Sequence, residues 1–268
     1  MKHFLLFSAA LLLFIGCLND SMEQYDDTAD LEFYESFLQQ EGVQMTDTGL
    51  LYRTIEEGEG ETPEGDDYTF VFYSGNSVDE SSSFRTGEDP DILQPSSFEN
   101  FAGIGEGIQL MNTGAIFEFV LPSDLALRDG RVYYFEIELE SFLMDPDQFL
   151  TQNAEQEDIS VTGSGLQYRT LEENENGGES PGPESTVRVN YVGTYTNGFV
   201  FDQSGSDPAE FSLDAVIPGF QEGIQLMNTG DSFELFLPSS IGYGSNPPQG
   251  IIPGAVLVFE VELVEVIN

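Results

Sequence analysis

The most restrictive feature of this sequence is an internal repeat. The segment GIQLMNTG at 107–114 returns unchanged at 223–230, and GLLYRT at 49–54 returns as GLQYRT at 165–170. Both pairs are displaced by 116 residues. Self-similarity at one fixed distance predicts tandem copies of a single folding unit.

Two further pairs of segments extend the repeat. FEFVLPS begins at Phe117 and returns as FELFLPS at Phe233, again 116 residues later. FEIEL at Phe135 returns as FEVEL at Phe259, but 124 residues later, which predicts an extra loop before the last strand of the second copy. The 268 residues allow two domains of ordinary size, one for each copy.

The stretch VIPGFQEGIQLMNTG at 216–230 predicts a short helix. Pro218 suits the first helical position, and Gly230 suits the left-handed turn after the last one. Between them large apolar residues recur at spacings of three, four and three, which places them on one face: Ile217, Phe220, Ile224 and Met227. The flanking segments VRVNYVGTY, ELFLP and VLVFEVELVEV alternate as half-buried strands. One helix lying on a curled antiparallel sheet is an α+β arrangement.

The charge of the chain is strongly negative. Forty-nine acidic residues stand against 7 basic ones, which gives a formal charge of -42, and Lys2 is the only lysine. Such a charge repels nucleic acid and anionic lipid surfaces, so a nucleic-acid role is excluded. Acidic residues spread over the whole chain favour adaptation to high salt, where screening removes the self-repulsion. A calcium-binding surface and an acid-rich interaction face are the alternatives.

The amino terminus predicts export and a lipid anchor. Residues 1–16 form a short apolar run after Lys2 and His3, which is the pattern of a signal peptide. The run ends at Cys17 in a segment, FIGC, that resembles a bacterial lipobox, so we expect lipidation of Cys17 and attachment to a membrane surface. Leu18 after the cysteine favours the outer membrane. The alternative is an ordinary signal peptide followed by an incidental cysteine.

The inventory of side chains excludes several kinds of catalysis. Without the signal peptide the chain has no histidine, and its single cysteine lies at the predicted anchor. Ser-His-Asp and Cys-His arrangements are therefore excluded, together with metal sites built on histidine or cysteine. Only oxygen-ligand sites for ions such as calcium remain, and no cofactor or metal is expected. A carboxylate pair for glycoside hydrolysis is disfavoured, because so many acids form accidental pairs.

From Tyr191 to Leu263 the sequence resembles the FKBP family of peptidyl-prolyl cis-trans isomerases. Four blocks occur in the order and at nearly the spacing of the family: VNYVGTYTNGFVFD, FSLDAVIPGFQEGIQLMNTG, LPSSIGYG and GIIPGAVLVFEVEL. The resemblance and the repeat together imply two tandem FKBP-like domains, each a curled antiparallel sheet wrapped on a short helix.

The resemblance also implies the residues of a site in the second copy. Tyr243 matches the tyrosine whose hydroxyl donates to a ligand carbonyl, Asp202 matches the acid beside the pocket, and Phe220 matches the pocket floor, where many members have Trp. The arginine that often accompanies the aspartate is missing, with Asp207 near its place. The implied catalytic residues are Tyr191, Phe201, Asp202, Tyr243 and Phe259. The implied substrate-binding residues are Phe211, Val216, Ile217, Phe220 and Ile251. The alternative for each aromatic residue is ordinary core packing.

Prolyl isomerisation is compatible with this inventory. Rotation about the amide faces a barrier of about 18–20 kcal/mol and breaks no covalent bond. A catalyst need only bind the twisted amide better than the planar one. Because the twisted amide is less dipolar, a dry aromatic pocket with one hydrogen-bond donor favours it over water.

The first copy lacks most of these residues. Where the second copy has FVFD the first has SSFR, with Phe84 followed by Arg85, and ENFAGIG replaces the VIPGF helix entry. The loop YGSNPPQGIIPG is reduced to ALRDG, although Tyr73 is retained. A folded but inactive domain is expected, with a role in dimerisation, substrate holding or spacing from the membrane.

These observations predict five segments: a lipoprotein signal peptide (1–16), an acidic tether and helix (17–42), a degenerate FKBP-like domain (43–143), a linker (144–158) and an isomerase domain (159–268). Within the tether, Asp30 is the expected cap of a helix at 30–40.

The leading functional hypothesis is a peptidyl-prolyl isomerase of the cell envelope that assists folding of exported proteins. Its expected partners are proline-containing or unfolded polypeptides, the membrane (outer, on its periplasmic or surface face) through Cys17, and a second copy in a homodimer. A non-catalytic chaperone that uses the same groove is the first alternative. A calcium-dependent adhesion or structural lipoprotein is the second.

Overall fold

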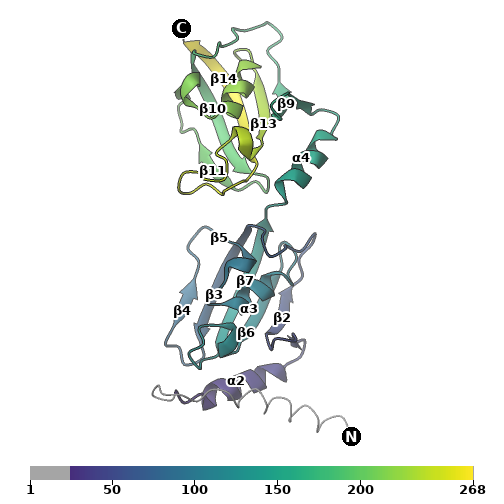
Figure 1. The fold of residues 1–268 in the computed structure, drawn as a ribbon, viewed down its shortest axis with the longest axis vertical. Coiled ribbons are helices and arrows are strands. Elements are labelled where there is room, and N and C mark those ends of the chain that lie inside the picture. Colours follow the sequence, from purple (N-terminus) through teal and green to yellow (C-terminus); the bar gives the residue numbers. More distant parts are fainter. Residues whose placement is uncertain (1–24, 268) are drawn as a thin grey trace.

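A computed structural model describes residues 25–267. It contains two seven-stranded sheets, formed by residues 44–142 and 160–267, in which the paired strands are antiparallel. The sheets follow each other along the long axis of the molecule, and a short helix lies on each (Figure 1). The α+β class is confirmed. The signal peptide predicted at 1–16 and the lipid attachment predicted at Cys17 lie outside the described residues.

The first domain comprises residues 28–143. Its sheet has the order β1-β2-β6-β7-β3-β4, with β5 paired to β3. The elements are α2 (Thr28–Leu38), β1 (Gln44–Met45), β2 (Leu51–Glu56), β3 (Thr69–Ser77), β4 (Ser83–Arg85), β5 (Asp91–Leu93), η2 (Pro95–Ser97), α3 (Ala102–Ile108), β6 (Ile116–Leu121), η3 (Ser123–Leu125) and β7 (Tyr133–Phe142).

The second domain, residues 146–267, repeats this topology. The strands β8 to β14 occupy, one for one, the places of β1 to β7, and β12 pairs with β10 as β5 pairs with β3. The elements are α4 (Pro146–Ala154), β8 (Ser160–Val161), β9 (Gln167–Glu172), β10 (Thr186–Tyr195), β11 (Val200–Gln203), β12 (Ala209–Ser212), η4 (Leu213–Ala215), α5 (Pro218–Gln225), β13 (Ser232–Leu237), η5 (Ser239–Ile241) and β14 (Leu257–Ile267). The extra loop predicted before the last strand connects η5 to β14.

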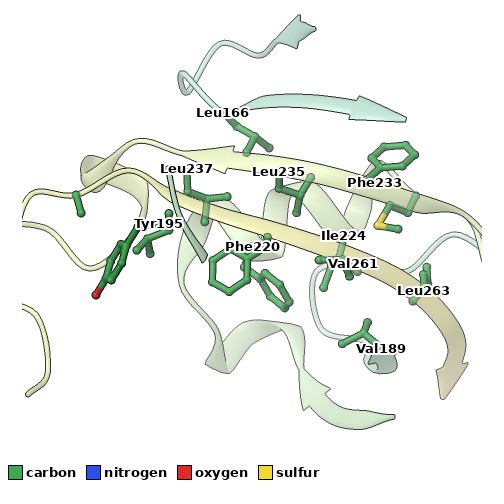
Figure 2. Packing of buried hydrophobic residues seen from close by; sticks show 14 of the residues in the cluster. Leu166, Val189, Tyr195, Phe220, Ile224, Phe233, Leu235, Leu237, Val261 and Leu263 are labelled. Atoms are coloured by element: carbon green, nitrogen blue, oxygen red, sulfur yellow. The ribbon is translucent and has the colours of Figure 1, made fainter. Parts of the chain in front are cut away.

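Helix α5 lies on the second sheet by the face that its spacing predicted. Pro218 is at its start, Phe220, Ile224 and Met227 are buried, and Ile217 is half-buried. Figure 2 shows Phe220 and Ile224 against the strands that carry Leu235, Leu237 and Val261. Burial of each such side chain stabilises the fold by about 1.5–3 kcal/mol.

The end of this helix was predicted too late. It ends at Gln225, and Gly230, with a φ of 92°, belongs instead to the turn that enters β13. The buried carboxylate of Asp231 organises that turn, because it accepts hydrogen bonds from the backbone N–H groups of Asn228 and Asn174, each at 2.7 Å. These competing bonds stop the helix before the glycine.

The helix predicted at 30–40 is present as α2, but Asp30 does not cap it. The N-cap residue is Asp27, whose side chain makes no capping bond. Asp30 is 1% exposed and accepts hydrogen bonds from the N–H of Val132 at 3.0 Å and the hydroxyl of Tyr25 at 2.7 Å. It therefore ties α2 to the start of β7.

The segment predicted as a linker contains helix α4. Asp145 caps this helix by accepting a hydrogen bond from the N–H of Gln148 at 2.9 Å. Phe149 and Leu150 pack on the second sheet, against Phe236, Val256 and Val258. The segment is thus packed on the second domain, as α2 is packed on the first.

A partly buried arginine–glutamate ion pair occurs at the same register position in both sheets. Arg53 on β2 faces Glu118 on β6, with 2.6 Å between Nε and Oε2. Arg169 on β9 faces Glu234 on β13, with 2.5 Å between the same atoms. The pairs reproduce the 116-residue displacement in three dimensions. Within residues 25–267 no helix has an apolar stretch long enough to cross a bilayer.

Candidate active site

Five aromatic side chains of the second domain, here called the aromatic site, meet beside α5. The ring centroid of Phe259 lies 5.0 Å from that of Phe220 and 5.6 Å from that of Phe201. Tyr191 lies 6.1 Å from Phe220 and 5.7 Å from Phe211. Phe220 and Phe259 are each 5% exposed, whereas the other three rings are half-buried. The aromatic site therefore has a buried floor and an accessible rim.

The rings approach the sheet closely because β10 has a glycine there. A Cβ on Gly193 would lie 2.9 Å from ring atoms of both Phe201 and Phe259. Real Cβ atoms do not tolerate such distances, so any other residue would displace at least one ring. Gly193 thus allows the floor to form.

Three aliphatic residues surround the aromatic rings. Val216 and Ile217 come directly before α5, and Ile251 lies on the long loop between η5 and β14. All three are half-buried and pack against the same apolar cluster as the rings. The loop is closed on itself by a hydrogen bond of 3.0 Å from the N–H of Gly254 to the carbonyl of Gly244.

A polar edge borders the aromatic site. The hydroxyl of Tyr191 donates to Asp202 at 2.8 Å. Burial and this carboxylate raise the pKa of Tyr191 above its ordinary value. Burial, and then the charge of Asp202, also raise the pKa of Tyr243. The Tyr243 side chain is 36% exposed, and its hydroxyl has no hydrogen-bond partner among residues 25–267. At neutral pH it is a protonated donor.

The structure brings the sequence-predicted site residues into one region. The rings of Tyr191, Phe201, Phe211, Phe220 and Phe259 are in contact, Val216, Ile217 and Ile251 join the same apolar cluster, and Asp202 and Tyr243 lie at its polar edge. The role of each residue in a reaction stays a prediction. Among residues 25–267 no group of three or more histidine, cysteine, aspartate or glutamate side chains is arranged to hold a metal ion.

The first domain fills the corresponding region with its own side chain. Phe101 stands where the second domain has Ile217, 116 residues later. Its ring centroid lies 5.3 Å from Phe84, 5.5 Å from Tyr133 and 5.6 Å from Phe135. Phe135 is the register equivalent of Phe259, so Phe101 covers the ring that forms the floor in the second domain.

A tyrosine–aspartate contact is common to both domains. Tyr73 occupies the register position of Tyr191, and its hydroxyl donates to Asp91 at 2.9 Å. Burial, together with that aspartate, raises the pKa of Tyr73 to about 12. The acceptor comes from β5 in the first domain and from β11 in the second, so the same contact is built from different strands.

Two residues beside the site were missed in the sequence. Gly193 and Tyr195 follow Tyr191 at a period of two on β10, which places all three on one face of the strand. That spacing, read inside the block VNYVGTYTNGFVFD, could have shown them. The significance of Tyr195 lies in contacts that only the folded chain makes.

The geometry indicates which kind of chemical group the aromatic site can accommodate. A floor of two buried rings accepts a compact apolar group, and a free hydroxyl at the edge can donate to one acceptor on it. No side chain at this site is arranged as a nucleophile. The fold and the site define an α+β domain with a cluster of aromatic rings beside its helix and a polar edge next to them.

Comparison with known proteins identifies the family. Residues 177–264 match the model of FKBP-type peptidyl-prolyl cis-trans isomerase. FKBP-type peptidyl-prolyl cis-trans isomerase FkpA of Aeromonas hydrophila is 43% identical over 122 residues, 45% of this chain and 45% of that protein. Outer membrane protein MIP of Legionella longbeachae is 39% identical over 123 residues, 45% of this chain and 52% of that protein. A crystal structure of FkpA from Escherichia coli has 36% identity and a TM-score of 0.43, and covers 45% of this chain and 56% of that one.

The second domain therefore belongs to the FKBP-type peptidyl-prolyl cis-trans isomerase family, as its four sequence blocks predicted. The chain spans about half the length of these two relatives from Aeromonas hydrophila and Legionella longbeachae.

Proposed function

We propose that the second domain catalyses cis–trans isomerisation of the peptide bond before proline. The observation that carries this proposal is the aromatic site itself. Phe220 and Phe259 form a floor on which a proline ring can lie, with Tyr191, Phe201 and Phe211 around it. It lies within the residues that match the isomerase family.

The proposed mechanism is preferential binding of the twisted amide. Rotation removes the conjugation that makes the planar amide dipolar and that creates a barrier of about 18–20 kcal/mol. The rings of the aromatic site replace water around the rotating bond and so favour its less dipolar state. No proton has to be transferred, and no covalent bond has to be made or broken.

The polar edge orients the bound chain and the ring of Tyr191. Tyr243 donates its unpartnered hydroxyl to a carbonyl of the bound chain, and its raised pKa keeps the proton in place. Asp202 holds the hydroxyl of Tyr191 and so fixes the orientation of that ring. Residues flanking the proline contact the surrounding apolar side chains: Phe211, Val216, Ile217 and Ile251.

A protease-coupled assay with a proline-containing peptide tests this proposal. It uses the full chain at high salt, because screening offsets the self-repulsion of a charge of -42. Tyr243→Phe removes one donor and should lower kcat/KM about fivefold. Tyr73→Phe, which removes one hydroxyl from the first domain, is the matched control and should leave turnover unchanged. A wild-type chain that folds but shows no turnover would contradict the proposal.

A holding function is the rival that the same assay separates. In the second domain Phe220 stands where many family members have Trp, and the arginine expected near Asp207 is missing. If these departures abolish catalysis, the chain would suppress aggregation of an unfolded substrate without accelerating proline isomerisation. Suppression that survives Tyr243→Phe, together with an absence of turnover in the wild type, would favour holding.

We also infer that the polypeptides on which this chain acts, its clients, are located in the cell envelope. The relative in Legionella longbeachae is named as an outer membrane protein, and the sequence here predicts both a signal peptide at 1–16 and lipid attachment at Cys17. Exported, proline-containing polypeptides are the proposed clients. Metabolic labelling with a palmitate analogue, compared between the wild type and Cys17→Ser, tests the anchor.

A further inference from the structure

One end of the first domain contributes to the core of the second. Phe70, at the start of β3, is fully buried, and Leu143, directly after β7, is 7% exposed. Both belong to the apolar cluster of the second domain and not to that of their own. Figure 1 shows this end of the first sheet, near β5, facing the end of the second sheet near β11.

The contact falls on the turn that joins β10 to β11. The ring of Phe70 lies 5.0 Å from that of Phe199 and 6.3 Å from that of Tyr195. Asn197, at the tip of the turn, donates a hydrogen bond of 2.9 Å to the hydroxyl of Ser141 on β7. The first domain thus holds this turn by ring packing and by one polar bond.

Tyr195 connects the turn to the site. It is 1% exposed, and its ring lies 5.0 Å from Phe201, which is part of the aromatic site. Its hydroxyl accepts a hydrogen bond from the N–H of Ile252 at 2.9 Å and lies 3.5 Å from the carbonyl oxygen of Gly250. In Figure 2 this hydroxyl points away from the aliphatic side chains of the core. Tyr195 therefore holds both ends of the tripeptide that contains Ile251.

Tyr195 links the first domain to this tripeptide, because it contacts both Phe70 and the backbone of Ile252. A cleft of about 380 Å³ separates residues 64–68 of the first domain from residues 252–256 of the second. In the first domain, Ser77 occupies the register position of Tyr195, and the long loop is absent. The tyrosine and the loop that it holds thus occur together, in the second domain.

We propose that the first domain positions one wall of the second domain's active site through Phe70 and Tyr195. Phe70 packs on the turn and on Tyr195, Tyr195 binds the backbone of residues 250–252, and Ile251 is thereby held against the apolar cluster that includes the aromatic site. Tyr195 is a positioning residue, because it acts through this loop. The proposal rests on the proposed isomerase function for its effect on turnover, but its structural part is independent of that function.

The test measures two properties of the full chain: amide hydrogen exchange at Ile252, and kcat/KM in the peptide assay. Phe70→Ala should raise exchange at Ile252 about tenfold and lower kcat/KM about fivefold, because a misplaced wall weakens transition-state contacts. Tyr195→Phe keeps the ring but removes the hydroxyl that accepts the hydrogen bond from Ile252. It should therefore change both readouts in the same direction as Phe70→Ala. Phe70→Leu, which keeps an apolar side chain at the junction, should restore most of the wild-type values.

Phe72→Ala is the matched control. Phe72 lies two residues further along β3 and is half-buried outside the cluster that contains Phe70. Its truncation should leave both readouts within about twofold of the wild type. Equal effects of Phe70→Ala and Phe72→Ala, or unchanged exchange at Ile252 in Tyr195→Phe, would overturn the proposal. If the wild type shows no turnover, the isomerase function fails, and exchange at Ile252 in the Phe70 variants still decides whether the first domain holds the loop.

Discussion

The two domains share a topology and differ in whether their aromatic side chains leave a site open. Both have the same strand order, an arginine–glutamate pair at the same register, and a tyrosine hydroxyl bound to an aspartate. At the entry to the helix, Phe101 of the first domain covers Phe135, whereas Ile217 of the second leaves Phe259 to the aromatic site. The ring of Phe101, the shorter loop and Ile104 in the place of the floor residue Phe220 thus all distinguish the filled core of the first domain from the candidate active site of the second.

Substituting each of these two helix-entry residues by the other tests the comparison between the domains. Of all the predictions, this one has the largest expected effect. Ile217→Phe should place a ring over Phe259 and lower kcat/KM about 100-fold, which corresponds to about 2.7 kcal/mol of lost transition-state binding. Because Ile217 is half-buried and not part of the closed core, the free energy of unfolding should change by less than about 1 kcal/mol. The peptide assay and calorimetry measure the two effects.

The reciprocal change, Phe101→Ile, is the control. It should uncover Phe135 without creating turnover, because the first domain has no counterpart of the loop that carries Tyr243 and Ile251. An Ile217→Phe variant that keeps wild-type activity would show that substrate does not lie over Phe259.

The ion pairs predict a smaller difference, in stability. Glu118 accepts hydrogen bonds from both Arg53 and the hydroxyl of Tyr134, at 2.6 Å each, whereas Glu234 is paired with Arg169. Glu118→Gln should therefore destabilise the first domain by about 2 kcal/mol, and Glu234→Gln should destabilise the second by about 1 kcal/mol. Calorimetry of the full chain measures both.

Glu138→Gln, at an exposed position on β7 opposite Ile116 and Phe72, is the control for the removal of a negative charge. If all three variants were equally stable, the ion pairs would have no structural role, and the effect of each change would be only a reduction of the overall charge.

The smallest predicted effect is on the pH dependence of stability. The pKa of Tyr73 is raised to about 12 in the folded chain, against about 10 for an unperturbed tyrosine. The folded state therefore keeps a proton that the unfolded state loses, and stability declines as the pH rises through this interval. Tyr73→Phe should make the decline shallower in urea unfolding between about pH 10 and about pH 12.

The pKa of Tyr191 is raised for the same reasons, burial first and then its aspartate, so Tyr191→Phe should act in the same direction. A decline in stability that neither substitution alters would mean that other groups govern the alkaline unfolding.

Much of the fold could be read from the sequence, because it depends on local patterns. The period of α5 placed Phe220, Ile224 and Met227 on one buried face, and Pro218 marked the start of the helix. The end of that helix could not be predicted in the same way, since it depends on Asp231, whose partner Asn174 is distant in the sequence. Asp30 was misassigned for a similar reason: a buried bond to Val132, far along the chain, competes with a local cap.

The sequence by itself determined that there are two related units, which of them carries the family's aromatic residues, and that the second has an additional loop. These features follow from repeats and residue types, which do not depend on long-range contacts. Only the tertiary structure decided that Phe101 covers the floor in the first domain, and that Phe70 of one domain packs on Tyr195 of the other. Such contacts depend on how side chains of separate elements fill a shared space, and neither period nor composition records that arrangement.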